Sequence, residues 1–291
     1  MSAICTDFSL EKNHLKAKSL QVINGAQTIS SLANQPSNPE IEILFRLTKT
    51  QSVKTEKGFN QQIILYNNSQ NLVKVSDFRS NDEIQLFLER EIDGRKPKGP
   101  LPKLRYVRKR GVGRRGAGQA IKLEDMAKIR YSFLYEPTLI HSAPKSLWSL
   151  SDSGGVYEKA FGVDGQVASA WARETLDEAL VAVAFYLRIA DATKRVGDGD
   201  PEMRFLRRLR FHGVALAGEF VRRRYEPPQA RELLGSESKF DEAWNTFWPV
   251  VRSVLIDVFT GAEEGGASMF GFVRSSERWQ QMIRRLRRHL A

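Results

Sequence analysis

SLQVINGAQTISSLANQ, residues 19–35, is the stretch that sets the fold class of the first part of the chain. Apolar Leu20 and Val22 alternate with polar neighbours, which is typical of a β-strand with one buried face. The Asn-Gly pair that follows is a turn signal, and Ile29 and Leu32 then recur at helical spacing. The stretch therefore predicts a strand, a tight turn and a helix, and with them a region of mixed α/β structure.

Three neighbouring segments extend this mixed region. Residues 41–47, IEILFRL, are β-branched and aromatic between polar flanks, which predicts a second strand. Residues 59–68 predict a short helix, and a longer helix is expected to begin after Ser80 or Asp82 and to run through IQLFLEREI. An acidic residue at such a start is favoured by the helix dipole. We assign residues 1–92 to a small α/β region that carries these elements.

The composition changes over residues 93–120, which are rich in Gly and Pro and carry many Lys and Arg. Long segments of this kind in compact proteins usually serve a function or lack fixed structure. Residues 104–107 predict a brief strand within it. We expect a basic connector here, between the α/β region and the rest of the chain.

The remainder of the chain, residues 121–291, is expected to be helical. Apolar residues at helical spacing predict helices at residues 123–136, 169–189, 201–225, 239–259 and 277–290. The first ends before Pro137, whose ring disfavours helix at the preceding residue, and the fourth is expected to be interrupted near Pro249. The expected fold class is α+β, with a small mixed α/β N-terminal region followed by a mostly α-helical C-terminal region.

The charge balance favours acidic partners. Lys and Arg number 45 against 34 Asp and Glu, a formal net charge of +11, which attracts phosphate-rich or otherwise acidic molecules. The single cysteine, Cys5, cannot form an internal disulfide, and the four histidines lack the spacing of metal ligands. We therefore expect a cytoplasmic protein without a structural metal. Since no leader pattern and no apolar run of roughly 20 residues is present, neither secretion nor a membrane span is expected.

Several motifs follow one another along the first 162 residues. They are INGAQT at Ile23–Thr28, YNNSQN at Tyr66–Asn71, SDFRSND at Ser76–Asp82, RYVRKRG at Arg105–Gly111, IKLEDMAK at Ile121–Lys128 and VYEKAFG at Val156–Gly162. In order and separation they resemble the motifs of the AIPR (abortive infection phage resistance) family. The resemblance implies a role in bacterial defence against phages. A substantial region precedes the first motif in that family, so we expect this chain to correspond to the family's C-terminal part.

The two amide-rich motifs form the first candidate binding site. Side-chain amides and hydroxyls both donate and accept hydrogen bonds, which suits the edges of bases, sugars and phosphates. A glycine at a helix start also lets backbone amides approach an anion closely. The candidates are Asn24, Gly25, Gln27, Thr28, Asn67, Asn68, Ser69, Gln70 and Asn71. The alternative is that these residues only form turns and cap helix ends.

The basic connector holds the second candidate site. Guanidinium groups bind phosphate through two hydrogen bonds, and an adjacent aromatic ring can stack on a base. The candidates are Arg105, Tyr106, Arg108, Lys109, Arg110, Arg114 and Arg115. The alternative is a solvated loop, or arginines that pair with internal carboxylates. Arginine runs at 222–224, 207–208, 284–285 and 287–288 are interpreted as the solvated faces of amphipathic helices.

These observations predict a phage-defence protein that binds nucleic acid or nucleotide through the amide motifs and the basic connector. One alternative is a metal-dependent nuclease, in which Asp77, Asp82 and Glu83, together with Glu89 and Glu91, would hold the metal. Another is a non-catalytic subunit that docks a protein partner or a second copy of itself. No pattern in the sequence identifies a catalytic residue or a cofactor.

Overall fold

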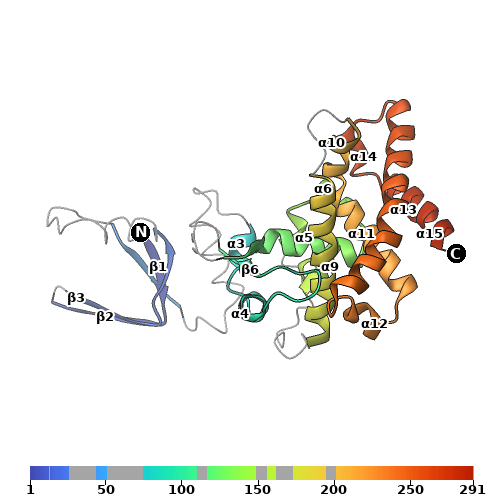
Figure 1. The fold of residues 1–291 in the computed structure, drawn as a ribbon. Helices are drawn as coiled ribbons and strands as arrows, with labels where there is room; N and C mark the ends of the chain where they lie inside the picture. Colours follow the sequence, from blue (N-terminus) through green and yellow to red (C-terminus); the bar gives the residue numbers. More distant parts are fainter. Residues whose placement is uncertain are drawn as a thin grey trace. The chain divides into compact units, whose positions relative to one another are not determined.

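The chain divides into two compact units, Met1–Lys74 and Val75–Ala291. The computed structural model describes residues 1–12, 14–25, 44–50, 75–109, 117–148, 156–161, 173–194 and 201–290. Strands make up the described part of the first unit, and helices dominate the second (Figure 1). The α+β fold class is therefore confirmed.

The first unit contains a small sheet and a hairpin. Its strands are β1 (Ser2–Cys5), β2 (Asp7–Glu11), β3 (His14–Lys18), β4 (Gln21–Asn24) and β5 (Arg46–Lys49). The sheet has the order β4-β1-β5, with β1 antiparallel to β4 and parallel to β5, while β2 and β3 pair antiparallel. The central strand β1 is the buried one, since Ala3, Ile4 and Cys5 are all inaccessible to solvent.

The first unit confirms part of the predicted strand, turn and helix. Strand β4 occupies the predicted strand, and Gly25 follows it with φ +94°, a conformation that favours glycine. A side chain at Gly25 would also lie 2.8 Å from Met1 Cγ. Strand β5 overlaps the end of the predicted strand at 41–47. The helix expected after the turn and the helix expected at 59–68 lie outside the described residues.

The second unit is built from helices and one short pair of parallel strands. Its elements are α3 (Val75–Arg79), α4 (Glu83–Gly94), β6 (Leu104–Val107), β7 (Gln119–Lys122), α5 (Leu123–Leu134), α6 (Thr138–Ser142), the 3₁₀ turn η1 (Ser146–Trp148), α7 (Val156–Phe161), α9 (Arg173–Ala192), α10 (Pro201–Arg208), α11 (Arg210–Arg224), α12 (Pro227–Glu232), α13 (Glu237–Glu264), α14 (Met269–Phe272) and α15 (Ser276–Leu290). Helix α4 and strand β6, which the sequence analysis assigned to the first region and to the connector, thus belong to this unit.

Helix α11 runs through the centre of the second unit. Its residues from His212 to Val221 are all buried, and it packs against α5, α9 and α15 (Figure 1). Phe220 of α11 contacts Phe247 of α13, which in turn contacts Phe185 of α9, with ring centroids 5.3 Å and 5.1 Å apart. One continuous apolar core therefore joins the long helices.

Most helix predictions for this unit are confirmed, with two corrections. Helix α4 begins after Asp82, and α5 ends before Pro137, as expected. The helix expected at 201–225 is two helices, which separate at the completely buried Leu209. The interruption expected near Pro249 is wrong, since α13 continues through it. Pro249 is exposed, and the buried residues on the opposite side of the helix hold the two halves in line. Among the described helices, none is long and apolar enough to cross a membrane.

Candidate functional site

The amide motifs are only partly within the described residues. Asn24 ends strand β4, and Gly25 follows it with a positive φ. Gln27, Thr28 and the residues from Asn67 to Asn71 lie outside the described ranges. Whether the two motifs meet in one cleft therefore stays a prediction.

Two candidate residues of the basic connector, Tyr106 in β6 and Arg108 directly after it, have internal contacts. Tyr106 is completely buried, and its Oη donates a hydrogen bond to Gln85 Oε1 at 2.5 Å, so the ring is not available to stack on a base. Arg108 is turned inward: its Nε donates to Glu89 Oε2 at 2.7 Å and its Nη1 to the carbonyl of Ser80 at 2.6 Å. Both side chains stabilise the fold. For Arg108, this is the alternative in which an arginine of the connector pairs with an internal carboxylate.

The other candidates of the connector divide between exposed and undescribed positions. Lys109 is exposed directly after β6, and Arg105 is half-buried within the strand. Arg110, Arg114 and Arg115 lie outside the described residues. Phosphate binding by these basic residues stays a prediction.

Tyr106 belongs to a buried polar network around Gln85. Gln85 is inaccessible to solvent, accepts from Tyr106 and donates through Nε2 to Tyr157 Oη at 2.8 Å. The Arg79 guanidinium lies 4.4 Å from the centre of the Tyr157 ring. Burial raises the pKa of Tyr157, helped by the neighbouring Asp82 carboxylate, and burial likewise raises the pKa of Tyr106. Both phenols therefore stay protonated and hold their hydrogen bonds at any physiological pH.

Segments that carry the family resemblance meet at this network. Ser76, Arg79 and Asp82 come from SDFRSND, Tyr106 and Arg108 from RYVRKRG, and Tyr157 from VYEKAFG. Ser76 Oγ also donates to Oε1 of Glu124, in IKLEDMAK, at 2.9 Å. Motifs that lie far apart in the sequence thus form one scaffold that joins α3, α4, β6, α5 and α7.

Loss of the central amide should destabilise this scaffold. We expect Gln85→Leu to lower the free energy of unfolding by about 2–4 kcal/mol, because two buried phenol groups lose a hydrogen-bond partner. Urea unfolding followed by tryptophan fluorescence measures it. The control is Gln280→Leu, at an exposed position of α15, which should change stability by no more than about 0.5 kcal/mol. Equal stability of the two variants would show that the network contributes little.

A basic groove lies next to the scaffold. Its volume is about 1150 Å³, and it is bordered by α4, the segment 94–104, the start of α9, helix α12 and the start of α13. We define the basic groove by its cationic lining residues Arg90, Arg95, Lys96, Lys98, Arg231 and Lys239. Three acids, Glu91, Asp177 and Glu232, also line it, so cations are in excess.

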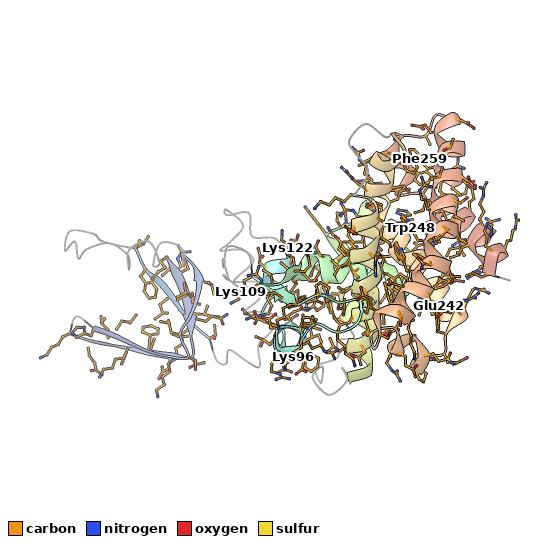
Figure 2. The ribbon with its side chains drawn as sticks, in the orientation of Figure 1. Lys96, Lys109, Lys122, Glu242, Trp248 and Phe259 are labelled. Carbon is orange, nitrogen blue, oxygen red and sulfur yellow. The ribbon has the colours of Figure 1, made fainter. Side chains whose placement is uncertain are left out.

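Ion pairs leave two lysines of the groove available. Arg95 Nη1 lies 2.6 Å from Asp177 Oδ1, and Lys239 Nζ lies 2.7 Å from Glu232 Oε2. Lys96 and Lys98 are exposed, and within the described part of the chain no side chain pairs with either. Figure 2 shows Lys96, together with Lys109 and Lys122, on the side of the second unit away from Phe259.

The groove wall is an ordered turn that glycine makes possible. Gly99 has φ +55°, and a side chain there would lie 2.6 Å from the carbonyl oxygen of Leu234. Lys98 and Leu101 exchange backbone hydrogen bonds across this turn. Lys103 Nζ donates to the carbonyls of Asp93 and Arg95, which binds the segment to the end of α4. The first part of the predicted connector is therefore folded against the helices.

The acids proposed for a metal do not gather in the described structure. Within the described ranges, no group of three or more His, Cys, Asp or Glu side chains could hold a metal ion. Asp82 precedes α4 as its N-cap without a side-chain capping bond, and Arg79 Nη1 lies 3.3 Å from its Oδ2.

The residues of the basic groove were not predicted as a site from the sequence. Lys96 and Lys98 flank a proline in the connector, and this Lys-Pro-Lys pattern could have marked an exposed basic turn. Arg231 and Lys239 carry no comparable signal, because they come from a segment about 130 residues further along the chain and join the groove only through folding.

Comparison with known proteins identifies the chain at the level of a family. The family model described as AIPR protein matches residues 1–246 of the 291-residue chain, well beyond the residues on which the resemblance rested. No curated protein and no solved structure matches it. The match covers most of both compact units, and the chain therefore belongs to the AIPR family, whose name refers to abortive infection phage resistance.

Proposed function

We propose that this AIPR protein takes part in phage defence by binding nucleic acid or nucleotide, and that the basic groove is its binding surface. The observation that supports the proposal most directly is the excess of cations around one concave surface, with the ammonium groups of Lys96 and Lys98 exposed at its edge. Phosphate groups would displace solvent and counterions from these lysines.

The rest of the groove suits the other parts of a nucleotide. Its lining includes Phe87, Ile92, Leu101 and Leu180, so an apolar floor lies beneath the charges. The Phe87 ring is half-buried, and the Arg90 guanidinium lies 5.5 Å from its centre. A cationic groove with a ring that can stack is the arrangement used to bind single strands without sequence preference. The amide motifs of the first unit are proposed separately as hydrogen-bond donors and acceptors for bases or sugars.

Reversal of charge at the groove edge tests this proposal. We expect Lys96→Glu/Lys98→Glu to weaken binding of a single-stranded oligonucleotide by about tenfold or more at low salt, because two cations that attract phosphate are replaced by two anions that repel it. Fluorescence anisotropy with labelled DNA and RNA, and competition by a nucleoside triphosphate, measure the effect.

The matched control places the same change in charge elsewhere in the second unit. Lys122→Glu/Lys145→Glu alters two exposed lysines outside the groove and should weaken binding by about twofold or less. Equal reductions in the two variants would mean that net charge alone matters and that the groove is not the site. No binding by the unmodified protein at low salt would refute the proposed function.

A further inference from the structure

Helices α11 and α15 bring together arginines that are more than 60 residues apart in the sequence. Arg223 Nε and Arg287 Nε donate to the same atom, Glu219 Oε1, at 2.7 Å and 2.8 Å. Arg222 Nη2 lies 3.8 Å from the other carboxylate oxygen of Glu219. We define the arginine face as these three arginines together with the exposed Arg224, Arg284 and Arg288 of the same two helices. Arg285 of α15 is also exposed but pairs with Asp257 of α13 and is not included.

Glu219 orients the centre of this face. Its side chain is nearly buried, and burial raises its pKa, but hydrogen bonds from Arg287 and Arg223 outweigh burial and leave the pKa below the ordinary value. Glu219 is therefore a charged, desolvated carboxylate, and such a group is tolerated only when it is paired. Each of these two hydrogen bonds uses Nε. The two Nη atoms of each guanidinium group, in Arg223 and in Arg287, therefore keep their N–H groups, which point to no other acceptor among the described residues.

A second contact fixes Arg222. The carbonyl of Phe133, near the end of α5, cannot bond to the backbone of residue 137, because that residue is a proline. Arg222 Nη1 donates to this carbonyl at 2.6 Å instead. Three guanidinium groups are thus held in place by the fold, which reduces the conformational freedom that would be lost on binding.

Arginines outnumber the carboxylate that they surround at the centre of the face. Glu219 is the shared partner of Arg222, Arg223 and Arg287, and Glu178 also interacts with Arg222. Arginine at the last turn of a helix is favoured by the helix dipole, and this accounts for arginines at both helix ends. The dipole does not account for a buried carboxylate that binds arginines from two helices at once.

We propose that the arginine face is a contact surface for the phosphate backbone of double-stranded nucleic acid, separate from the basic groove. Planar guanidinium groups match phosphate oxygens with paired hydrogen bonds. The face lies on exposed helical turns and its charged groups are guanidinium groups, so it suits a regular array of phosphates. Large exposed apolar residues of the described chain lie on other elements than α11 and α15, which disfavours a lipid surface.

Neutralisation of two arginines tests the proposal. The variant Arg287→Gln/Arg288→Gln is compared with the unmodified full chain for binding of a short labelled DNA or RNA duplex, by anisotropy between about 50 and about 200 mM salt. We expect about tenfold weaker binding and a plot of log affinity against log salt that is shallower by about two, one for each arginine that no longer neutralises a phosphate. An unchanged affinity and slope would overturn the proposal.

Two further variants separate position from net charge. Arg208→Gln/Arg274→Gln removes two exposed arginines from other elements and should leave duplex binding within about twofold. Glu219→Gln raises the net charge but releases the arginines, so weaker duplex binding with retained folding supports the proposed orientation, whereas tighter binding overturns it. Equal weakening in both arginine pairs would also overturn it, as would binding to vesicles of anionic lipid without binding to duplex.

The two proposed sites can fail independently. The groove variant Lys96→Glu/Lys98→Glu is measured with single strands and nucleotide, and the arginine variants with duplex. Loss of single-strand binding only in the groove variant, together with loss of duplex binding only in Arg287→Gln/Arg288→Gln, is the result expected if both are correct.

Discussion

Replacement of Gly218 by alanine is expected to lower the free energy of unfolding of the second unit by at least about 3 kcal/mol. A Cβ at this position would lie 1.9 Å from the carbonyl oxygen of Phe133, an atom of the α5 backbone. No side-chain rotation can relieve such a contact, so α11 and α5 would have to move apart in the middle of the core. Gly218 is therefore required for the close crossing of these two helices.

The same movement would break a compensating hydrogen bond. The Phe133 carbonyl depends on Arg222, because Pro137 has no N–H to offer it. Separation of the helices would leave this carbonyl without its donor and release one member of the arginine face. We therefore expect Gly218→Ala also to weaken duplex binding, as a consequence of the displaced helix.

Urea unfolding followed by tryptophan fluorescence measures the stability of the second unit, because all five tryptophans lie beyond residue 147. Gly261→Ala is the matched control: Gly261 lies in α13, and an added Cβ there would meet no atom within 4 Å. It should be neutral or stabilise by about 0.5–1 kcal/mol, because alanine favours helix. A Gly218→Ala protein as stable as the control would contradict the crossing described for α5 and α11.

Acidification is expected to destabilise the second unit through two stacked histidines. His212 of α11 is buried, and its ring centre lies 5.4 Å from that of His141 in α6. His212 Nδ1 and His141 Nε2 are buried without a hydrogen-bond partner in the described structure. Burial, together with His141, lowers the pKa of His212 to about 3. Burial, together with Lys128 and Arg274, lowers the pKa of His141 to about 4.

The direction of the effect follows from proton binding. In the unfolded chain both imidazoles take up a proton near pH 6.5, whereas in the folded protein they remain neutral down to about pH 4. Between these values the unfolded chain binds more protons, so stability is complete above pH 6.5 and falls as the pH decreases. Each histidine contributes a slope of about 1.4 kcal/mol per pH unit, and His212 alone a loss on the order of 3 kcal/mol by pH 4.

Urea unfolding at a series of pH values tests this expectation. His212→Leu should lower by about one the number of protons that the unfolded chain binds in excess of the folded protein. The free energy of unfolding should then fall with decreasing pH about half as steeply. The control, His289→Gln at an exposed position of α15, should keep the dependence of the unmodified protein. If His212→Leu retains the full slope, the titrating groups lie elsewhere in the unit.

Elements with strong local signals could be predicted from the sequence. Residues 104–107 form the strand expected there, α4 begins after Asp82, and α5 ends before Pro137. Strands β1, β2 and β3 and the partner strand β7 were not predicted, because pairing between strands depends on distant residues. The interruption expected at Pro249 is wrong for a related reason. Burial of the opposite side of the helix keeps α13 continuous, and burial is not visible in the local pattern.

The sequence predicted the basic character of the candidate site but not which residues form it. A basic connector was expected, yet the roles of its members differ: Tyr106 and Arg108 are turned into the scaffold, whereas Lys96 and Lys98 face the groove. Side chains alternate between the two sides of a strand. The sequence does not reveal which side becomes the interior when the element that packs against the strand is unknown. The amide motifs, which carried the first site prediction, lie mostly outside the described residues.

The sequence by itself determined the fold class, the basic character and membership of the AIPR family, because helical periodicity, net charge and ordered motifs are properties of the linear chain. Only the tertiary structure decided which cations form internal pairs and which are exposed at the basic groove. In the linear chain, the arginines near residues 222 and 287 belong to separate solvated helix faces, and in the folded protein Glu219 joins them. The physical reason is that a buried carboxylate and a close helix crossing at Gly218 arise from contacts between segments far apart in the chain, and no local pattern specifies them.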